Sequence, residues 1–199
     1  MRSFFHNFEL LNFLAFRWQN KIELKVYHSL DEVPVIKNPV ITLGTYDGVH
    51  LGHQKIIDFL NESAGKIDGE SVLFTFHPHP RMVLHPDDHH LELIQTIAQR
   101  TRSLEKAGVQ HLILHPFTLD FAKQSATEFV RNVLVNQLNV SVLTIGYNHH
   151  FGKNREGNIE LLKELSEVYN FEVQEIPALR HGELSVSSTK IRRAIRDGD

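Results

Sequence analysis

The chain contains 199 residues, of which 41% are hydrophobic and 23% are charged, so a folded domain is expected and a disordered or fibrous protein is excluded. Its 21 Lys and Arg residues stand against 24 Asp and Glu residues, and the formal net charge of −3 does not favour binding to a nucleic-acid backbone. The sequence contains no cysteine, which excludes disulfides, thiolate metal sites and a cysteine nucleophile and is compatible with a cytoplasmic location.

The first 24 residues do not have the pattern of a membrane or export signal. Polar side chains interrupt their aromatic and aliphatic ones, so no apolar run reaches the roughly 18 residues of a membrane-spanning helix. A clean apolar centre and a small-residue cleavage site are also missing, and basic residues are too few for an interfacial helix. We therefore expect a poorly ordered extension over 1–24, no membrane partner, and a globular domain over 25–199.

From residue 25 onward, short apolar runs alternate with helical periodicities. Strands that alternate with helices imply right-handed crossovers and a parallel sheet with both faces covered. We therefore predict a single α/β domain with a Rossmann-like, doubly wound parallel sheet. Buried strands are expected at 40–43, 71–76, 109–114, 140–145 and 171–176, and helices are expected at 56–64, 97–107, 126–138, 161–169 and from Ser187 onward.

The strand predicted at 40–43 runs into the segment G-T-Y-D-G-V-H-L-G-H, which covers residues 44–53. Its glycines allow a tight turn and close approach of a ligand, and His50 and His53 lie where the next helix begins. Because the N-terminal amides of a helix attract anions, the segment predicts a polyphosphate site. Two other interpretations are a glycine turn with solvated histidines and a two-histidine metal site, which would need further ligands. The segment is neither a P-loop nor the dinucleotide fingerprint.

A second polar motif, V-S-S-T-K-I-R-R at 186–193, opens the last predicted helix. Its hydroxyl side chains are suited to cap this helix or to bind phosphate, and its basic side chains add positive charge. By itself, the motif favours a capped and solvated helix. The residues concerned are Ser187, Ser188, Thr189, Lys190, Arg192 and Arg193.

Combined, the two motifs resemble the H-x-G-H and S-S-T-x-x-R segments with which the nucleotidylyltransferase superfamily grips ATP. Two further segments, F-T-F-H-P-H-P-R at 74–81 and I-G-Y-N-H-H-F-G-K-N-R-E-G at 145–157, extend the resemblance to the FMN adenylyltransferase module of prokaryotic bifunctional FAD synthetases. The likeness runs from about residue 25 to the end of the chain. It implies a nucleotidylyltransferase-type fold and the transfer of AMP from ATP to FMN, with FAD and pyrophosphate as products and Mg²⁺ as cofactor.

The resemblance also implies roles for the motif residues. His50 and His53 would hold the α- and β-phosphates of ATP, and Arg192 would help to hold the β- and γ-phosphates that leave as pyrophosphate, so these three are the expected catalytic residues. Mg²⁺ would bridge phosphate oxygens without a certain protein ligand, and Asp47 either reaches it through water or forms a turn. The expected ATP-binding residues are Gly44, Tyr46, Asp47, Gly48, His50, Gly52, His53, Ser187, Ser188, Thr189 and Arg192.

For FMN, the resemblance implies contacts from the loop around 79–81 and from 148–155. Arg81 would pair with the FMN phosphate, and Asn148 would hydrogen-bond the flavin ring. The sequence departs from the family pattern at two places, because Asn148 stands where Asp is more frequent and His77 stands where an acidic residue is frequent. The expected FMN-binding residues are His79, Pro80, Arg81, Asn148, Phe151 and Arg155.

Bifunctional members of this family carry a riboflavin kinase module after the adenylyltransferase region, whereas the present sequence ends at Asp199. We therefore expect no kinase activity from these 199 residues, and a longer parent chain would supply it. Residues 1–24 match no part of the family pattern. Two rival functions remain compatible with the sequence: a related transferase that uses a sugar phosphate or pantetheine phosphate, and a non-catalytic, His-rich metal- or nucleotide-binding module.

The remaining histidines have weaker functional signals. His85, His89 and His90 fall in a polar stretch that predicts either a loop closing over substrate or a metal site. The two histidines beside the strand predicted at 109–114 are expected to be structural, whereas the adjacent pair in the 145–157 segment is equally compatible with ligand contact. These four residues are His111, His115, His149 and His150.

Overall fold

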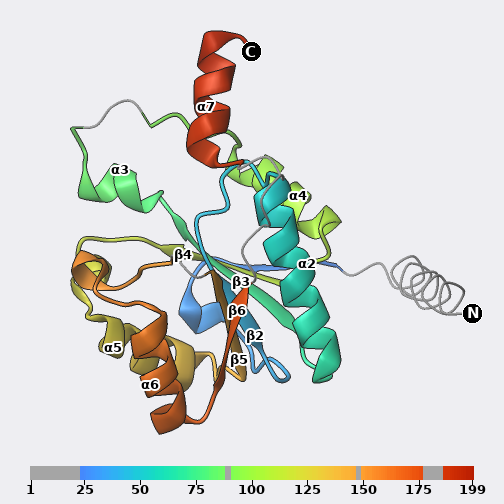
Figure 1. The fold of residues 1–199 in the computed structure, drawn as a ribbon, viewed down its shortest axis with the longest axis vertical. Coiled ribbons are helices and arrows are strands. Elements are labelled where there is room, and N and C mark those ends of the chain that lie inside the picture. The colour runs from blue at the N-terminus through green and yellow to red at the C-terminus, as the bar shows by residue number, and fades with distance from the viewer. Residues whose placement is uncertain (1–22, 88–90, 147–148, 177–185) are drawn as a thin grey trace, which may run out of the picture.

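The computed structural model describes residues 23–87, 91–146, 149–176 and 186–199. At its centre lies a six-stranded sheet with the order β1-β4-β3-β2-β5-β6 (Figure 1). Every neighbouring pair of strands is parallel, which confirms the predicted Rossmann-like, doubly wound α/β architecture. The strands are β1 (Lys25–Tyr27), β2 (Val40–Leu43), β3 (Ser71–His77), β4 (His111–Pro116), β5 (Val142–Gly146) and β6 (Glu172–Ile176).

Several of the connecting helices begin at a capping side chain. Thr96 caps α4 and Ser125 caps α5, each through a capping box with the glutamine or glutamate three residues later. Helix α5 continues directly into the π-helical segment η3, and together they occupy most of the helix predicted at 126–138. The helices are α2 (Leu51–Lys66), α3 (Pro80–Leu84), α4 (Ile97–Lys106), α5 (Ala126–Phe129), η3 (Val130–Gln137), α6 (Ile159–Tyr169) and α7 (Ser188–Asp197), with short 3₁₀ turns η1 (Leu30–Glu32), η2 (Phe121–Lys123) and η4 (Lys153–Arg155).

The predicted element boundaries differ from the observed ones where burial and strand pairing do not coincide. Val109 and Val140 are buried, but the ladders of β4 and β5 begin only at His111 and Val142, because an apolar run reports burial and not hydrogen bonding. Helix α3 was not predicted; it begins at Pro80, whose fixed φ suits a first helical position. The predicted extension over 1–24 lies almost entirely outside the described residues.

Helices cover both faces of the sheet. Along β2, Ile41 and Leu43 belong to the large core cluster that includes η3 and α6, whereas Val40 packs with Leu60 and Ala64 of α2 on the opposite face. Figure 1 shows the same division, with α5 and α6 on one side of the sheet and α2 on the other. Burial on both faces explains why the strands are continuous apolar runs instead of alternating ones.

The carboxyl edge of the sheet gathers the polar motifs. Strand β2 pairs with β3 on one side and with β5 on the other, so the chain order reverses at β2, and ligands of such sheets bind at this switch point. Loop 44–50 follows β2, helix α3 follows β3 after a short turn, and residues 149–157 come after β5. Among the described helices, none has the length and apolarity needed to cross a membrane.

Candidate active site

Loop 44–50 ends at His50, which caps the N-terminus of α2. The Nδ1 atom of His50 accepts a hydrogen bond from the backbone N–H of His53 at 3.4 Å, and the two imidazole rings stack with their centroids 3.7 Å apart. Tyr46 packs against His53 with ring centroids 5.0 Å apart. Gly52 permits this arrangement, because an added Cβ would lie 3.2 Å from the ring of His50. The local fold therefore brings both predicted histidines together at a helix N-terminus.

The environment of these two rings keeps them uncharged. Burial lowers the pKa of His50, and burial together with the neighbouring His50 ring lowers the pKa of His53 to about 3. Both imidazoles are therefore neutral at pH 7 in the free protein. The Nδ1 atom of His53 is buried and has no hydrogen-bond partner among the residues that the structure describes. A neutral ring with an unmatched nitrogen is suited to bind a ligand through hydrogen bonds.

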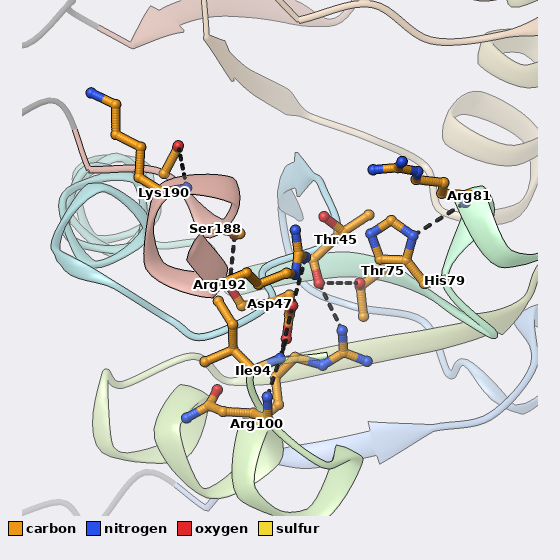
Figure 2. Close-up of polar contacts among 12 residues, drawn as sticks. Thr45, Asp47, Thr75, His79, Arg81, Ile94, Arg100, Ser188, Lys190 and Arg192 are labelled. Atoms are coloured by element: carbon orange, nitrogen blue, oxygen red, sulfur yellow. Dashed lines mark hydrogen bonds and ion pairs between the residues drawn. The ribbon is translucent and has the colours of Figure 1, made fainter. Parts of the chain in front are cut away.

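Asp47 is the acidic residue of loop 44–50, and its side chain is only 1% exposed. Its carboxylate accepts backbone N–H bonds from Ile94 at 3.0 and 3.1 Å and from Gln95 at 3.3 Å. It also pairs with the guanidinium of Arg192 at a distance of 2.7 Å between Oδ2 and Nη2. Figure 2 shows these contacts converging on Asp47 from separate elements. The two nucleotide motifs predicted from the sequence are thus in direct contact.

The first turn of α7 lies against the same loop. Ser187 caps α7 by accepting a hydrogen bond from the backbone N–H of Lys190 at 3.3 Å. The hydroxyl of Ser188 donates to the backbone carbonyl oxygen of Asp47 at 2.8 Å (Figure 2). Thr189 follows Ser188 in the first turn of α7. The predicted capping role of Ser187 is therefore confirmed, and the N-terminus of α7 joins that of α2 near loop 44–50.

Arg100 of α4 belongs to this cluster, although no sequence motif pointed to it. Its Nη1 donates to the carbonyl oxygen of Thr45 at 2.7 Å, and the hydroxyl of Thr75 donates to the same oxygen at 3.3 Å (Figure 2). Burial lowers the pKa of Arg100, while the charge of Asp47 opposes this shift. The spacing of Arg100 and Leu104 could have indicated this position, because residues four apart lie on the same side of a helix. Both are the buried residues of α4, and an arginine on the apolar side of a helix is unusual.

Helix α3 carries the first group of predicted flavin contacts. His79 caps α3 by accepting the backbone N–H of Arg81 at its Nδ1 atom, at 3.1 Å, and Pro80 occupies the first helical turn. Burial lowers the pKa of His79, and the positive charge of Arg192 lowers it further. Figure 2 shows His79 and Arg81 beyond Thr75, on the side away from α7. His79 is thus close enough to the second nucleotide motif for the charge of Arg192 to shift its pKa.

The second group of predicted flavin contacts lies in residues 149–157. Phe151 and Gly157 exchange backbone hydrogen bonds of 3.1 and 2.9 Å, and the ring of Phe151 packs near that of Phe129 with centroids 5.9 Å apart. An added Cβ at Gly157 would lie 2.7 Å from the Phe151 ring, so only glycine fits there. Arg155 is exposed, and Asn148 lies outside the described residues.

Two of the remaining histidines lie in β4, and two others, His149 and His150, are described without a contact that tests their ligand role. His111 is buried and bridges the hydroxyl of Tyr27 at 3.0 Å and the carboxylate of Glu70 at 3.1 Å, which confirms its structural interpretation. His115 packs beside Phe121 with ring centroids 4.8 Å apart. His89 and His90 lie outside the described residues. Within the described ranges, no group of three or more His, Cys, Asp or Glu side chains is arranged to hold a metal ion.

The sheet order, the motif loop after β2 and the joined helix N-termini define a Rossmann-like α/β domain of the nucleotidylyltransferase type. A family model described as FAD synthetase matches residues 33–190, and the chain belongs to this family. A Listeria monocytogenes FAD synthetase is 36% identical over 80% of this chain and 64% of its own length. A bifunctional riboflavin kinase/FMN adenylyltransferase of Buchnera aphidicola (subsp. Schizaphis graminum) is 33% identical over 84% of this chain and 53% of its own length.

A solved structure supports the fold assignment. A Streptococcus pneumoniae protein, described as a macrolide-efflux protein, superposes with a TM-score of 0.75 at 31% identity and covers 89% of this chain and 58% of its own. The chain therefore spans between about half and two thirds of the length of the proteins it matches. The family resemblance inferred from the four sequence motifs is confirmed.

Proposed function

We propose that this chain catalyses the transfer of AMP from Mg²⁺-bound ATP to FMN, which yields FAD and pyrophosphate in FAD biosynthesis. The observation that carries the proposal is the meeting of two helix N-termini, those of α2 and α7, at the loop that holds His50 and Asp47. Membership of the FAD synthetase family supplies the identity of the substrates. Because ATP and FMN are charged cytoplasmic metabolites, the proposed reaction implies a cytoplasmic enzyme.

The reaction needs positioning and charge neutralisation more than a protein nucleophile. An oxygen of the FMN phosphate attacks the α-phosphorus of ATP, a new P–O bond forms, and the bond to the bridging β-oxygen breaks so that pyrophosphate leaves with the electron pair. In the proposed complex, His50 and His53 donate hydrogen bonds to the α- and β-phosphates. Arg192 and the first turn of α7 neutralise the leaving pyrophosphate, on which negative charge develops.

Mg²⁺ fits this site as part of the nucleotide. Neutral imidazoles and a guanidinium are suited to phosphate oxygens, and the carboxylate of Asp47 already accepts hydrogen bonds from three protein donors. We propose that the ATP phosphates supply the main ligands of Mg²⁺, as is common for this ion. The bound ion would lower the negative charge of the phosphates before attack.

The flavin contacts of the proposal come from the segments that follow β3 and β5, the two neighbours of β2 in the sheet. Arg81 on α3 is proposed to bind the FMN phosphate, with His79 and Pro80 beside it. Phe151 and Arg155 are proposed to contact the flavin, together with Asn148. The bifunctional relatives are also named riboflavin kinases, and we propose that residues 25–199 do not supply that activity.

Chromatographic separation of flavins tests the proposed function. The chain is incubated with Mg²⁺-ATP and, in separate reactions, FMN or riboflavin, and pyrophosphate release is followed in parallel. We expect FAD from FMN, no product from riboflavin, and no product when EDTA replaces Mg²⁺. A folded chain that binds ATP but uses pantetheine phosphate or a sugar phosphate in place of FMN would contradict the proposed acceptor.

A further inference from the structure

We propose that Asp47 is a positioning residue that holds Arg192 and keeps the first turn of α7 against loop 44–50, and that it is not a ligand of ATP or Mg²⁺. The inference rests on the proposed function for the identity of the nucleotide. The sequence left two roles open for Asp47, a contact to Mg²⁺ through water and the formation of a turn. A contact through water needs a free carboxylate oxygen, whereas a turn needs only a local acceptor, so the hydrogen bonds of the carboxylate test the first role.

The carboxylate of Asp47 is buried and engaged at both oxygens by three protein donors. Oδ1 accepts the backbone N–H groups of Ile94 at 3.0 Å and Gln95 at 3.3 Å. Oδ2 accepts the same Ile94 N–H at 3.1 Å and the Nη2 of Arg192 at 2.7 Å. A carboxylate offers about four acceptor positions, and here three donors, one of them shared between the two oxygens, make four contacts. Its side chain is also only 1% exposed, so solvent does not reach it.

Asp47 connects three segments that are distant in the sequence. Its side chain binds the backbone at 94–95 and Arg192 of α7, and its carbonyl oxygen accepts the hydroxyl of Ser188. The packing around the loop is equally close, since Gly48 has a φ of +89° and an added Cβ there would lie 2.9 Å from the side chain of Ile94. Asp47 therefore fixes α7 to loop 44–50 through both its side chain and its backbone.

The hydrogen bond from Arg192 to Asp47 orders the guanidinium before a ligand binds, which favours anion binding. A free arginine loses rotamer freedom when it binds a phosphate, whereas Arg192 is already ordered by its bond to Asp47. Its side chain is 13% exposed, whereas that of Asp47 is 1% exposed, so the arginine is the partner that is closer to the surface. Its Nε atom is buried and has no hydrogen-bond partner among the described residues. The guanidinium is thus oriented without all of its donors being used.

The buried charges around Asp47 do not cancel. Asp47 carries one negative charge, while Arg192 and Arg100 each carry a positive one. Arg100 is 4% exposed, and the charge of Asp47 acts on its pKa, although its guanidinium donates to the neutral carbonyl oxygen of Thr45. The cluster therefore retains one positive charge, which a phosphate would neutralise. Asp47 orders Arg192 without removing the attraction for an anion.

A double-mutant cycle tests whether Asp47 acts through Arg192. The dissociation constant of Mg²⁺-ATP is measured by calorimetry on the full chain for the wild type, Asp47→Asn, Arg192→Ala and the double variant. We expect each single variant to weaken ATP binding by about tenfold or more, because a charge-assisted contact is lost or misplaced. In the Arg192→Ala background, Asp47→Asn should change the affinity by less than about twofold, because its target is gone.

Two controls separate positioning from general damage. Asp58→Asn on the exposed side of α2 removes the same charge and should leave ATP affinity unchanged. In kinetic assays, Asp47→Asn should raise the KM for ATP by about tenfold and leave the KM for FMN within about twofold, whereas general destabilisation would raise both.

A spectroscopic measurement needs no substitution at Asp47. In nitrogen-15 NMR spectra of arginine side chains, the guanidinium of Arg192 should give a slowly exchanging signal that disappears in Arg192→Lys. We expect this signal to persist when Mg²⁺-ATP is added. Its loss on ATP binding would show that Arg192 leaves Asp47, and additive effects in the double-mutant cycle would show that Asp47 acts independently; either result overturns the proposal. A chain that shows coupling in ATP affinity but makes no FAD would retain this inference and lose the proposed function.

Discussion

The proposed nucleotide side and the proposed flavin side of the candidate site are built by different means. On the nucleotide side, loop 44–50 and α7 are joined by buried charged groups, chiefly the pair between Asp47 and Arg192 at 2.7 Å. On the flavin side, residues 149–157 are held by a backbone bridge and by the packing of Phe151, and Arg155 stays exposed. Charged groups are therefore fixed in place on the first side, whereas close packing fixes the shape of the second.

This difference has a physical basis in the proposed substrates. A phosphate chain carries charge that is best matched by donors whose positions are set before binding. A planar ring system is matched by a surface, and glycines that let backbone and aromatic rings approach closely can form one. Substitutions of the fixed charged groups should therefore change the KM for ATP, whereas substitutions in the close packing around Phe151 should change the KM for FMN.

The largest expected effect comes from removing both imidazoles on the nucleotide side. In the double variant His50→Ala, His53→Ala, we expect FAD formation to fall by about 1,000-fold, because two donors to the transition state are lost. FAD formation under saturating FMN is the measurement. His28→Ala, an exposed histidine near β1, is the control and should retain wild-type turnover. Full turnover of the double variant would remove both residues from the proposed mechanism.

Two glycine variants, one on each side of the site, test whether the two sides affect different substrates. In Gly157→Ala, the new Cβ would lie 2.7 Å from the Phe151 ring, so we expect the KM for FMN to rise by about tenfold while the KM for ATP changes little. In Gly48→Ala, a φ of +89° and a Cβ 2.9 Å from Ile94 should disturb the loop and raise the KM for ATP instead.

Steady-state kinetics with one substrate varied at a time measure both effects. Gly65→Ala is the control, because no atom lies within 4 Å of an added Cβ there, and alanine should stabilise α2 by about 0.5–1 kcal/mol. Equal changes in both KM values for each glycine variant would mean that the two sides are not independent.

The smallest effect concerns stability at acidic pH, and it draws on both sides of the site. Burial and neighbouring charge lower the pKa of His53 to about 3 and that of His149 to about 4, below the ordinary value of 6.5. Below pH 6.5 the unfolded chain therefore binds protons that the folded chain does not, so stability decreases as the pH falls. Each residue should contribute a loss of about 1 kcal/mol between pH 7.5 and 5.5.

Urea unfolding at these two pH values checks this expectation. His53→Gln and His149→Gln should each reduce the pH-dependent loss of the free energy of unfolding by about 1 kcal/mol. Variants with the same pH dependence as the wild type would show that neither ring is held neutral in the folded protein.

Local sequence patterns were enough to predict much of the fold and the general place of the site. Apolar runs identified β2, β3 and β6, and the spacing of Phe129, Val130 and Val133 identified the α5–η3 helix, because periodicity reflects which side of an element is buried. The H-x-G-H and S-S-T-x-x-R segments predicted that His50, His53 and Arg192 form one group, and the structure brings Arg192 to Asp47, three residues before His50.

Sequence patterns alone were thus sufficient for the sheet class, the motifs at its carboxyl edge and most of the elements, since these depend on neighbouring residues, but β1 and α3 were not predicted. Only the tertiary structure decided the partners of individual charges. Asp47 and Arg192 are 145 positions apart, and Arg100 reaches Thr45 across 55 positions, so no local pattern could pair them. Whether a buried carboxylate binds a metal, forms a turn or orders an arginine depends on which donors the fold brings to it, because each of its acceptor sites can be used only once.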